Sequence, residues 1–223
     1  MATTARELHL DYFQIYDVVN QELSGRIKIC GQFDKEDRVC RLLCLDWFAN
    51  PVGKNREPLC DRRAHLAGYR IYPSSPEPTR QVAVVNQFGE QRIVIGNVVA
   101  LLAPSEKIER GSAFPENLSH FVVYQVLEGK PVEKRVDLKD QFGSSRAMVM
   151  NPYGFAVPVK KTYGAAVFPA LNEKVHMVLY RITPRTVEKD CAVKDQFEKR
   201  KIKVIRSILL AAPTIKRRWS VRS

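Results

Sequence analysis

The four histidines are the residues whose spacing most suggests chemistry. Each opens a similar segment, and these segments read HLDYFQI from His9, HLAGYRI from His65, HFVVYQV from His120 and HMVLYRI from His176. Successive histidines are 56, 55 and 56 residues apart, and each is followed four positions later by an aromatic residue. In a closed four-fold ring, four equivalent imidazoles could meet near the axis and bind a transition metal.

A structural role is the stronger interpretation of these histidines. A residue that occurs in every copy of a repeat usually belongs to the packing of the unit itself. No Asp or Glu stands at a fixed offset from all four histidines, where it would orient a metal-bound imidazole. We therefore expect no metal and no cofactor, and we interpret the histidines as markers of strand beginnings.

A Gln-Phe pair also occurs four times, and its phenylalanines are Phe33, Phe88, Phe142 and Phe197. The residue before each Gln is Gly, Asn or Asp, all of which suit turns. We expect each Phe to fold back under a hairpin turn and to close the end of its unit's core. The Gln amide is expected to bond turn backbone that would otherwise be unpaired.

A third marker is an apolar run that ends in Pro-x-x-Lys. It reads LLAPSEK at 101–107, FAVPVKK at 155–161 and LAAPTIK at 210–216. In the first copy we align LLCLDWF at 42–48, which lacks both Pro and Lys. A basic residue also follows each Gln by five or six positions: Arg38, Arg92, Arg146 and Lys201.

These markers divide the chain into four copies of about 55 residues. Copy 1 covers residues 1–60 and is degenerate, copy 2 covers 61–115, copy 3 covers 116–171, and copy 4 covers 172–223 with a basic tail. The alternating and apolar runs predict an all-β fold with about four short strands per copy. The near-equal spacing favours a four-bladed propeller-like ring, with two paired barrels or sandwiches as the alternative.

The net charge of +12 is concentrated in the last quarter of the chain. The candidate polyanion-binding residues are Lys199, Arg200, Lys201, Lys203 and Arg206, followed by Lys216, Arg217, Arg218 and Trp219 in the tail. Such a surface could hold phosphates, and Trp219 could stack on a base. The plain alternative is a solvated edge strand, whose lysines oppose aggregation, followed by a frayed tail.

Several classes of protein are disfavoured. The sequence contains no G-x-S-x-G, Walker, H-E-x-x-H or Rossmann glycine motif, and no acid recurs in all four copies. The five cysteines are an odd number without a C-x-x-C pair, which argues against a disulfide framework or a zinc site. No apolar run is long enough to span a bilayer. The N-terminal residues do not resemble a signal peptide, so we expect a cytoplasmic protein, or a secreted one if the native N-terminus has been removed.

The markers resemble a family of β-repeats of unknown function that occurs mostly in bacterial, often secreted, proteins. Its units read His-x-x-Cys-Tyr, then Asp/Asn-Gln-Phe-Gly, then Leu-Cys-x-Pro-x-x-Lys. The paired cysteines of that family are missing here, because Gly68 and Leu102 stand at their positions in copy 2, and Val123 and Ala156 in copy 3. The resemblance supplies no activity.

We therefore expect a non-enzymatic β-repeat scaffold that presents loops and a basic face to a protein or polyanionic partner. The alternative is a nucleic-acid-binding protein that uses copy 4 and the basic tail. The oligomeric state does not follow from the sequence.

Overall fold

The computed structural model describes residues 8–222, which form eleven β-strands. In chain order the strands are β1 (Tyr12–Gly31), β2 (Arg38–Lys54), β3 (His65–Pro73), β4 (Arg80–Asn86), β5 (Gly89–Lys107), β6 (His120–Glu128), β7 (Lys134–Asp140), β8 (Gly143–Tyr163), β9 (Ala166–Phe168), β10 (Val175–Lys194) and β11 (Lys199–Val221). The all-β prediction is confirmed.

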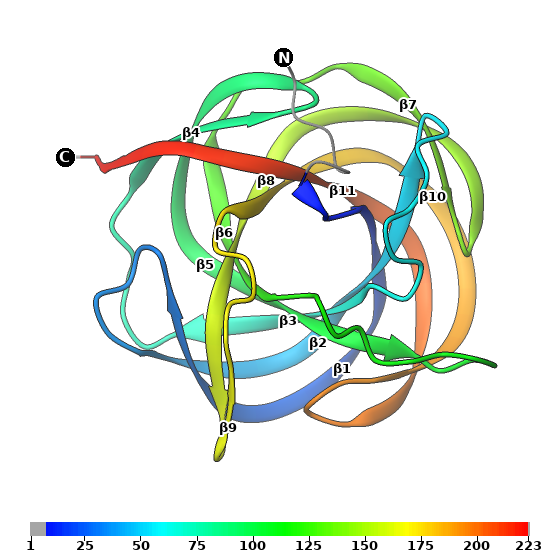
Figure 1. The fold of residues 1–223 in the computed structure, drawn as a ribbon, viewed down its shortest axis with the longest axis horizontal. Helices are drawn as coiled ribbons and strands as arrows, with labels where there is room; N and C mark the ends of the chain where they lie inside the picture. Colours follow the sequence, from blue (N-terminus) through cyan, green and yellow to red (C-terminus); the bar gives the residue numbers. More distant parts are fainter. Residues whose placement is uncertain (1–7, 223) are drawn as a thin grey trace.

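The four copies form one antiparallel sheet whose ladders close into a ring, seen along its short axis in Figure 1. In each copy the strand that begins at the histidine position pairs with the Pro-x-x-Lys strand of its own copy. It also pairs with the Pro-x-x-Lys strand of the copy before it. Thus β3 pairs with both β5 and β2, and β6 pairs with both β8 and β5. The first and last strands close the ring, with Phe13 opposite Ala211.

Separate propeller blades are not confirmed, because neighbouring copies share backbone hydrogen bonds in a single sheet. This single sheet includes all four copies, so the alternative of two separate paired barrels or sandwiches is not observed either. Each copy is built on three strand segments, and copy 3 has the short β9 as a fourth strand. In copies 1 and 4 the first two segments run together as the 20-residue strands β1 and β10.

The first copy is less degenerate than its sequence indicates. Tyr12 lies opposite Val52, as His65 lies opposite Ser105 in copy 2. Tyr12 therefore takes the histidine position, and the Pro-x-x-Lys of this copy is Pro51 to Lys54. The assignment of His9 as a repeat marker is wrong, because His9 lies before the strand, is exposed and has a φ of 50°. The true pair in copy 1 is Tyr12 and Tyr16, and the pair His9 and Phe13, three residues earlier, has the same four-residue spacing by chance.

Beyond the ring, the end of each Pro-x-x-Lys strand pairs with the Gln-Phe hairpin of the copy two positions further on. The pairs are β2 with β7, β5 with β10, β8 with β1, and β11 with β4. The hairpins consequently lie over the outside of the ring. This cross-pairing repeats four times and links copies that are not adjacent in the sequence.

Both faces of the ring are buried, which is why its segments read as continuous apolar runs such as HFVVY. One hydrophobic cluster draws on all eight ring segments and contains no hairpin residue, so we infer that it fills the inside of the ring. The larger cluster includes hairpin residues such as Val136 and Val193 and lies under the hairpins. The inside is tight: a Cβ added at Gly68 would lie 2.7 Å from the Cβ of Trp47.

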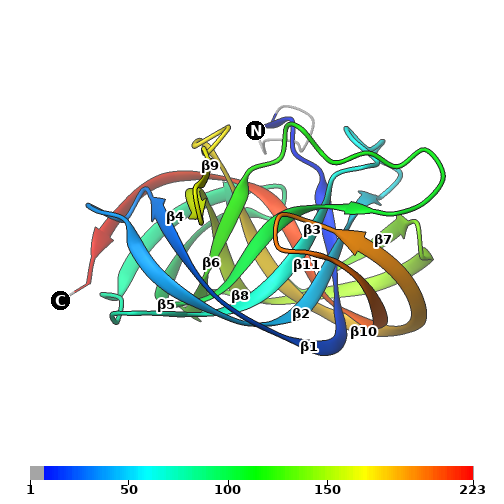
Figure 2. The same ribbon diagram turned by 90° about the horizontal axis from the view of Figure 1, so that it is seen from below.

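The linkers at 55–64 and 108–119, together with β9, project toward the same end of the ring, which is uppermost in Figure 2. No helix within residues 8–222 has the length and apolarity that a membrane crossing requires.

Candidate functional site

The repeated aromatic residues pack in four equivalent pairs, each joining copies two positions apart. In every pair the Phe of a Gln-Phe turn meets a Tyr edge to face, with centroids 4.8–5.4 Å apart. The pairs are Phe33 with Tyr124, Phe88 with Tyr180, Phe142 with Tyr16, and Phe197 with Tyr69. Each Phe therefore closes a core that it shares with the opposite copy, not the core of its own unit alone.

The turns are held by the Asp or Asn residue, not by the Gln. The carboxylate of Asp140 accepts the Phe142 N–H at 2.8 Å and the Tyr16 hydroxyl at 2.7 Å. In three copies the Gln side chain instead accepts a hydrogen bond from a lysine of the preceding copy, whereas Gln87 donates to Glu57 at 3.4 Å. For example, Lys107 Nζ donates to Gln141 Oε1 at 2.6 Å. The expectation that Gln bonds its own turn is therefore wrong.

The four Pro-x-x-Lys lysines lie over the same phenylalanines. Their Nζ atoms are 4.4–6.0 Å from the ring centroids of the next copy's Phe: Lys54 over Phe88, Lys107 over Phe142, Lys161 over Phe197, and Lys216 over Phe33. Lys161 is fully buried, and burial lowers its pKa to about 7. These contacts place the lysines in the scaffold.

The repeat histidines do not converge. His65 stacks on Phe48 and His176 stacks on Phe155, whereas His120 tilts against Phe168. Burial lowers the pKa of His65 to about 4 and the pKa values of His120 and His176 to about 3. Within residues 8–222 no three potential metal ligands of the His, Cys, Asp or Glu types lie together.

The basic residues of copy 4 fall into two groups at opposite ends of β11, separated by the mostly buried stretch 207–214. Near its start, Lys199, Lys201, Lys203 and Arg206 are exposed. Arg206 Nε already pairs with Asp17 at 3.2 Å, and the side chain of Arg200 is only 7% exposed, against Glu198. The structure therefore does not combine the nine predicted residues into one surface.

The tail is a strand and is not frayed, because residues 215–221 of β11 pair with β4. Lys216 is used internally, bonded to Gln32 and lying over Phe33. Trp219 packs edge to face on Phe33 at 5.0 Å and is 41% exposed. Arg217 and Arg218 remain on the surface.

Arg218 lies opposite Ala83 of β4, and Ala83 lies opposite Arg92 of β5. Directly opposed residues point to the same side of a sheet, and two strand spacings put the two arginine Cα atoms about 10 Å apart. Ala83 leaves a hollow of about 280 Å³ between them, bordered by Gln81 and Ser220. We call Arg218, Ala83 and Arg92 the arginine row.

The arginine row is not neutralised. Neither guanidinium has an acidic partner within 4.0 Å among the described residues. At the equivalent place in copy 3, Asp137 replaces Ala83 and pairs with Arg146 at 2.8 Å. Two close arginine forks over a small residue suit the oxygens of a phosphate, sulfate or carboxylate.

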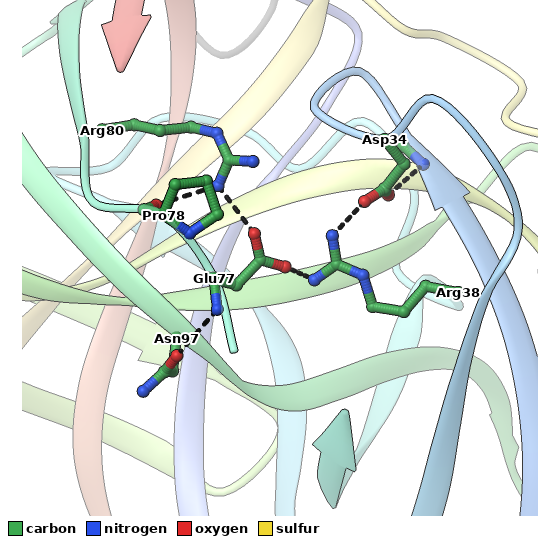
Figure 3. Close-up of polar contacts among 7 residues, drawn as sticks. Asp34, Arg38, Glu77, Pro78, Arg80 and Asn97 are labelled. Atoms are coloured by element: carbon green, nitrogen blue, oxygen red, sulfur yellow. Dashed lines mark hydrogen bonds and ion pairs between the residues drawn. The ribbon is translucent and has the colours of Figure 1, made fainter. Parts of the chain in front are cut away.

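Beneath the row, two interior arginines are bound to a buried carboxylate, although Arg80 Nε has no hydrogen-bond partner among the described residues. Glu77, whose side chain is 0% exposed, binds Arg38 and also accepts from Arg80 Nη1 at 2.7 Å (Figure 3). Arg38 also pairs with Asp34, and Glu77 N–H donates to Asn97 Oδ1 at 3.2 Å. This network fastens the loop before β4 to the turn of copy 1, and its arginines are unavailable to a partner.

Arg92 was not among the predicted binding residues, although it was recognised as a recurring basic position. Its partnership with Arg218 depends on the β4–β11 pairing, which joins copies 2 and 4 and leaves no local signal in the sequence.

The comparison with known families identifies a repeat in this chain. The family model described as a repeat of unknown function (DUF7450) covers residues 65–212, from the histidine of copy 2 into the Pro-x-x-Lys segment of copy 4. Neither the curated proteins nor the solved structures include a match to the chain. The chain therefore belongs to this family of repeats of unknown function.

Proposed function

We propose that this protein is a non-enzymatic binding scaffold that presents a basic face to a polyanionic partner. The observation that carries the proposal is the arginine row, where Arg92 and Arg218 face solvent across Ala83 without an acidic neighbour. The repeated His, Tyr, Phe and Lys side chains are occupied in packing the ring. Specific recognition is therefore assigned to positions where the copies differ.

Copy 3 supplies a control within the same molecule. Arg146 has the same place in its hairpin as Arg92, yet Asp137 already neutralises it. Removing a free cation should weaken the binding of a polyanion. Removing one that is paired with a carboxylate on the surface should have little effect.

The test is a titration of the Trp47→Phe variant, in which Trp219 is the remaining tryptophan and reports on the adjacent row. The probes are inorganic polyphosphate, poly-glutamate and a single-stranded oligonucleotide, each over a salt series. Arg92→Ala and Arg218→Ala should each weaken polyphosphate binding and reduce the salt slope by about one. Arg146→Ala should change neither the affinity for polyphosphate nor the salt slope. Equal effects of the three substitutions, or no salt-dependent binding, would overturn the proposal.

Nucleic-acid binding is the second candidate, and Trp219 beside Arg218 is the observation that favours it. A base could stack on the exposed part of this ring, whose other side packs on Phe33. In that case the oligonucleotide should bind more tightly than polyphosphate at matched charge, and Trp219→Ala, titrated by calorimetry because it lacks the fluorescent reporter, should remove the difference. If the two probes bind alike in both proteins, the nucleic-acid candidate fails.

A further inference from the structure

The turn that follows β2 has an unusual residue at a demanding position. Asn55 and Arg56 have φ values of 51° and 68°, and Glu57 N–H donates to the Lys54 carbonyl at 3.0 Å. These features describe a type I′ turn, which requires positive φ at both central residues and strongly prefers Asn-Gly. Asn55 suits the first position, whereas Arg56 takes the place where glycine is expected.

The surrounding structure holds this turn in place. Asn55 N–H donates to the Asp137 carbonyl at 2.8 Å, and Asp137 N–H donates to Asn55 Oδ1 at 3.0 Å. The turn is thereby tied to β7 of copy 3. An arginine kept in a left-handed conformation that glycine would adopt more easily indicates a use for its side chain.

Arg56 lines a groove of about 910 Å³ between residues 51–62 and the β7–β8 hairpin. This volume lies within the range of roughly 300–1,000 Å³ of small-molecule sites. Four side chains give the groove an apolar part: Pro51, Pro58, Leu59 and Leu138. Ser144 and Ser145 of β8 line it as well, and as neighbours on a strand their side chains point to opposite faces.

The acidic groups of the groove are already engaged. Asp140 holds the Tyr16 hydroxyl, Asp137 pairs with Arg146 at 2.8 Å, and Glu57 pairs with Lys54 at 3.2 Å. In contrast, three cations that line the groove have no ion pair within residues 8–222: Arg56, Arg62 and Lys139. Four cations (Arg56, Arg62, Lys139 and Arg146) and three carboxylates (Glu57, Asp137 and Asp140) line the groove, so it carries a small excess of positive charge next to an apolar floor.

We propose that this groove binds a small phosphate ester of about nucleotide size, with Arg56 as the principal phosphate ligand. The planar guanidinium matches phosphate oxygens, and the hydroxyl of Ser144, opposite Lys139, is a suitable additional donor. A bare phosphate would fill little of the volume, so the ester's organic body lies on Pro58, Leu59 and Leu138. This site is distinct from the arginine row, which lies on the β4–β5–β11 face.

The test compares adenosine 5′-monophosphate, phenyl phosphate, inorganic phosphate and adenosine by isothermal titration calorimetry with the full chain. Both esters should bind more tightly than inorganic phosphate, and adenosine should bind more weakly than its monophosphate. Arg56→Gly should weaken binding of both esters about 10–100-fold, the range expected for loss of a charge-assisted hydrogen bond. The midpoint of thermal unfolding of R56G should equal or exceed that of the wild type, since glycine suits the turn.

Two control variants complete the design. Arg63→Ala removes a nearby exposed arginine that pairs with Asp61 at 3.6 Å and does not line the groove, so it should leave ester binding unchanged. The double variant R92A/R218A should also leave it unchanged, which separates this site from the proposed polyanion surface. The inference is overturned if R56G binds both esters as the wild type does, if adenosine binds as well as its monophosphate, or if no ester binding saturates.

Discussion

Tyr16 and Phe142 meet edge to face, with ring centroids 5.2 Å apart, although they belong to copies 1 and 3. The Tyr16 hydroxyl also donates to Asp140, two residues before Phe142, at 2.7 Å. One contact thus joins a ring strand to the hairpin of the opposite copy. A similar arrangement connects Tyr180 with Phe88 and Asn86, except that the Asn86 amide donates to the Tyr180 hydroxyl at 2.9 Å.

Phe142→Ala should lower the free energy of unfolding by about 3 kcal/mol, because a large side chain is lost from a shared core. Tyr16→Phe keeps the ring and removes a hydrogen bond, so it should cost about 1 kcal/mol. The coupling between the two rings is measured by urea unfolding of four proteins: the wild type, Y16A, F142A and the double variant. We expect a coupling free energy of about 1 kcal/mol. A cost below about 1 kcal/mol for F142A would place this Phe on the surface.

Lys161 should make the protein more stable as the pH rises through the alkaline range. Burial lowers its pKa to about 7 from the usual 10.5 of a lysine, so between these values the unfolded chain carries a proton that the folded chain lacks. Stability should therefore rise with pH in this window, by at most about 1.4 kcal/mol per pH unit relative to Lys161→Met. Urea unfolding from pH 7 to 10 measures the difference. Lys160→Met, at the exposed neighbouring lysine, is the control and should keep the wild-type increase of stability with pH. If the stability of K161M changes with pH in parallel with the wild type, the pH dependence does not come from Lys161.

The buried histidines should destabilise the protein in mild acid. The pKa of His65 is lowered by burial to about 4, so the unfolded chain takes up a proton below pH 6.5 while the folded chain does not. Stability contributed by this group is lost as the pH falls from about 6.5 to 4. His65→Tyr copies the Tyr12 of copy 1 and should flatten the curve by up to about 1.4 kcal/mol per pH unit. His9→Gln, on the surface, serves as the control and should follow the wild type; an unchanged H65Y curve would contradict the prediction.

Gly68→Ala should destabilise the inside of the ring by about 1–3 kcal/mol, because the new methyl group would lie 2.7 Å from the Cβ of Trp47. Gly96→Ala is the matched comparison, since its nearest neighbour is the exposed and adaptable Leu127 side chain at 3.0 Å. Thermal unfolding should show the larger loss for G68A. Equal losses would mean that the ring interior relaxes as easily as the surface.

The sequence by itself determined the four-fold repetition and the all-β class. Both depend on local information, because strand periodicity and turn residues such as Asp140 and Gly143 are visible within a few positions of the chain. The Gln-Phe turns and the Pro-x-x-Lys ends of copies 2 to 4 were located for the same reason. Copy 1 was misaligned because Tyr12 replaces the histidine, so the marker residue itself was missing.

Only the tertiary structure decided which copies touch. Backbone hydrogen bonding does not depend on side-chain identity, so no residue type announces that β11 pairs with β4 or that β2 pairs with β7. These pairings bring Arg218 beside Arg92 and tie the Asn55–Arg56 turn to Asp137. The basic residues of β11 fall into two groups because the middle of this strand is buried in the core. The candidate sites therefore arise from contacts between copies that are distant in the sequence. The strands and turns that make these contacts are specified by local sequence patterns within each copy.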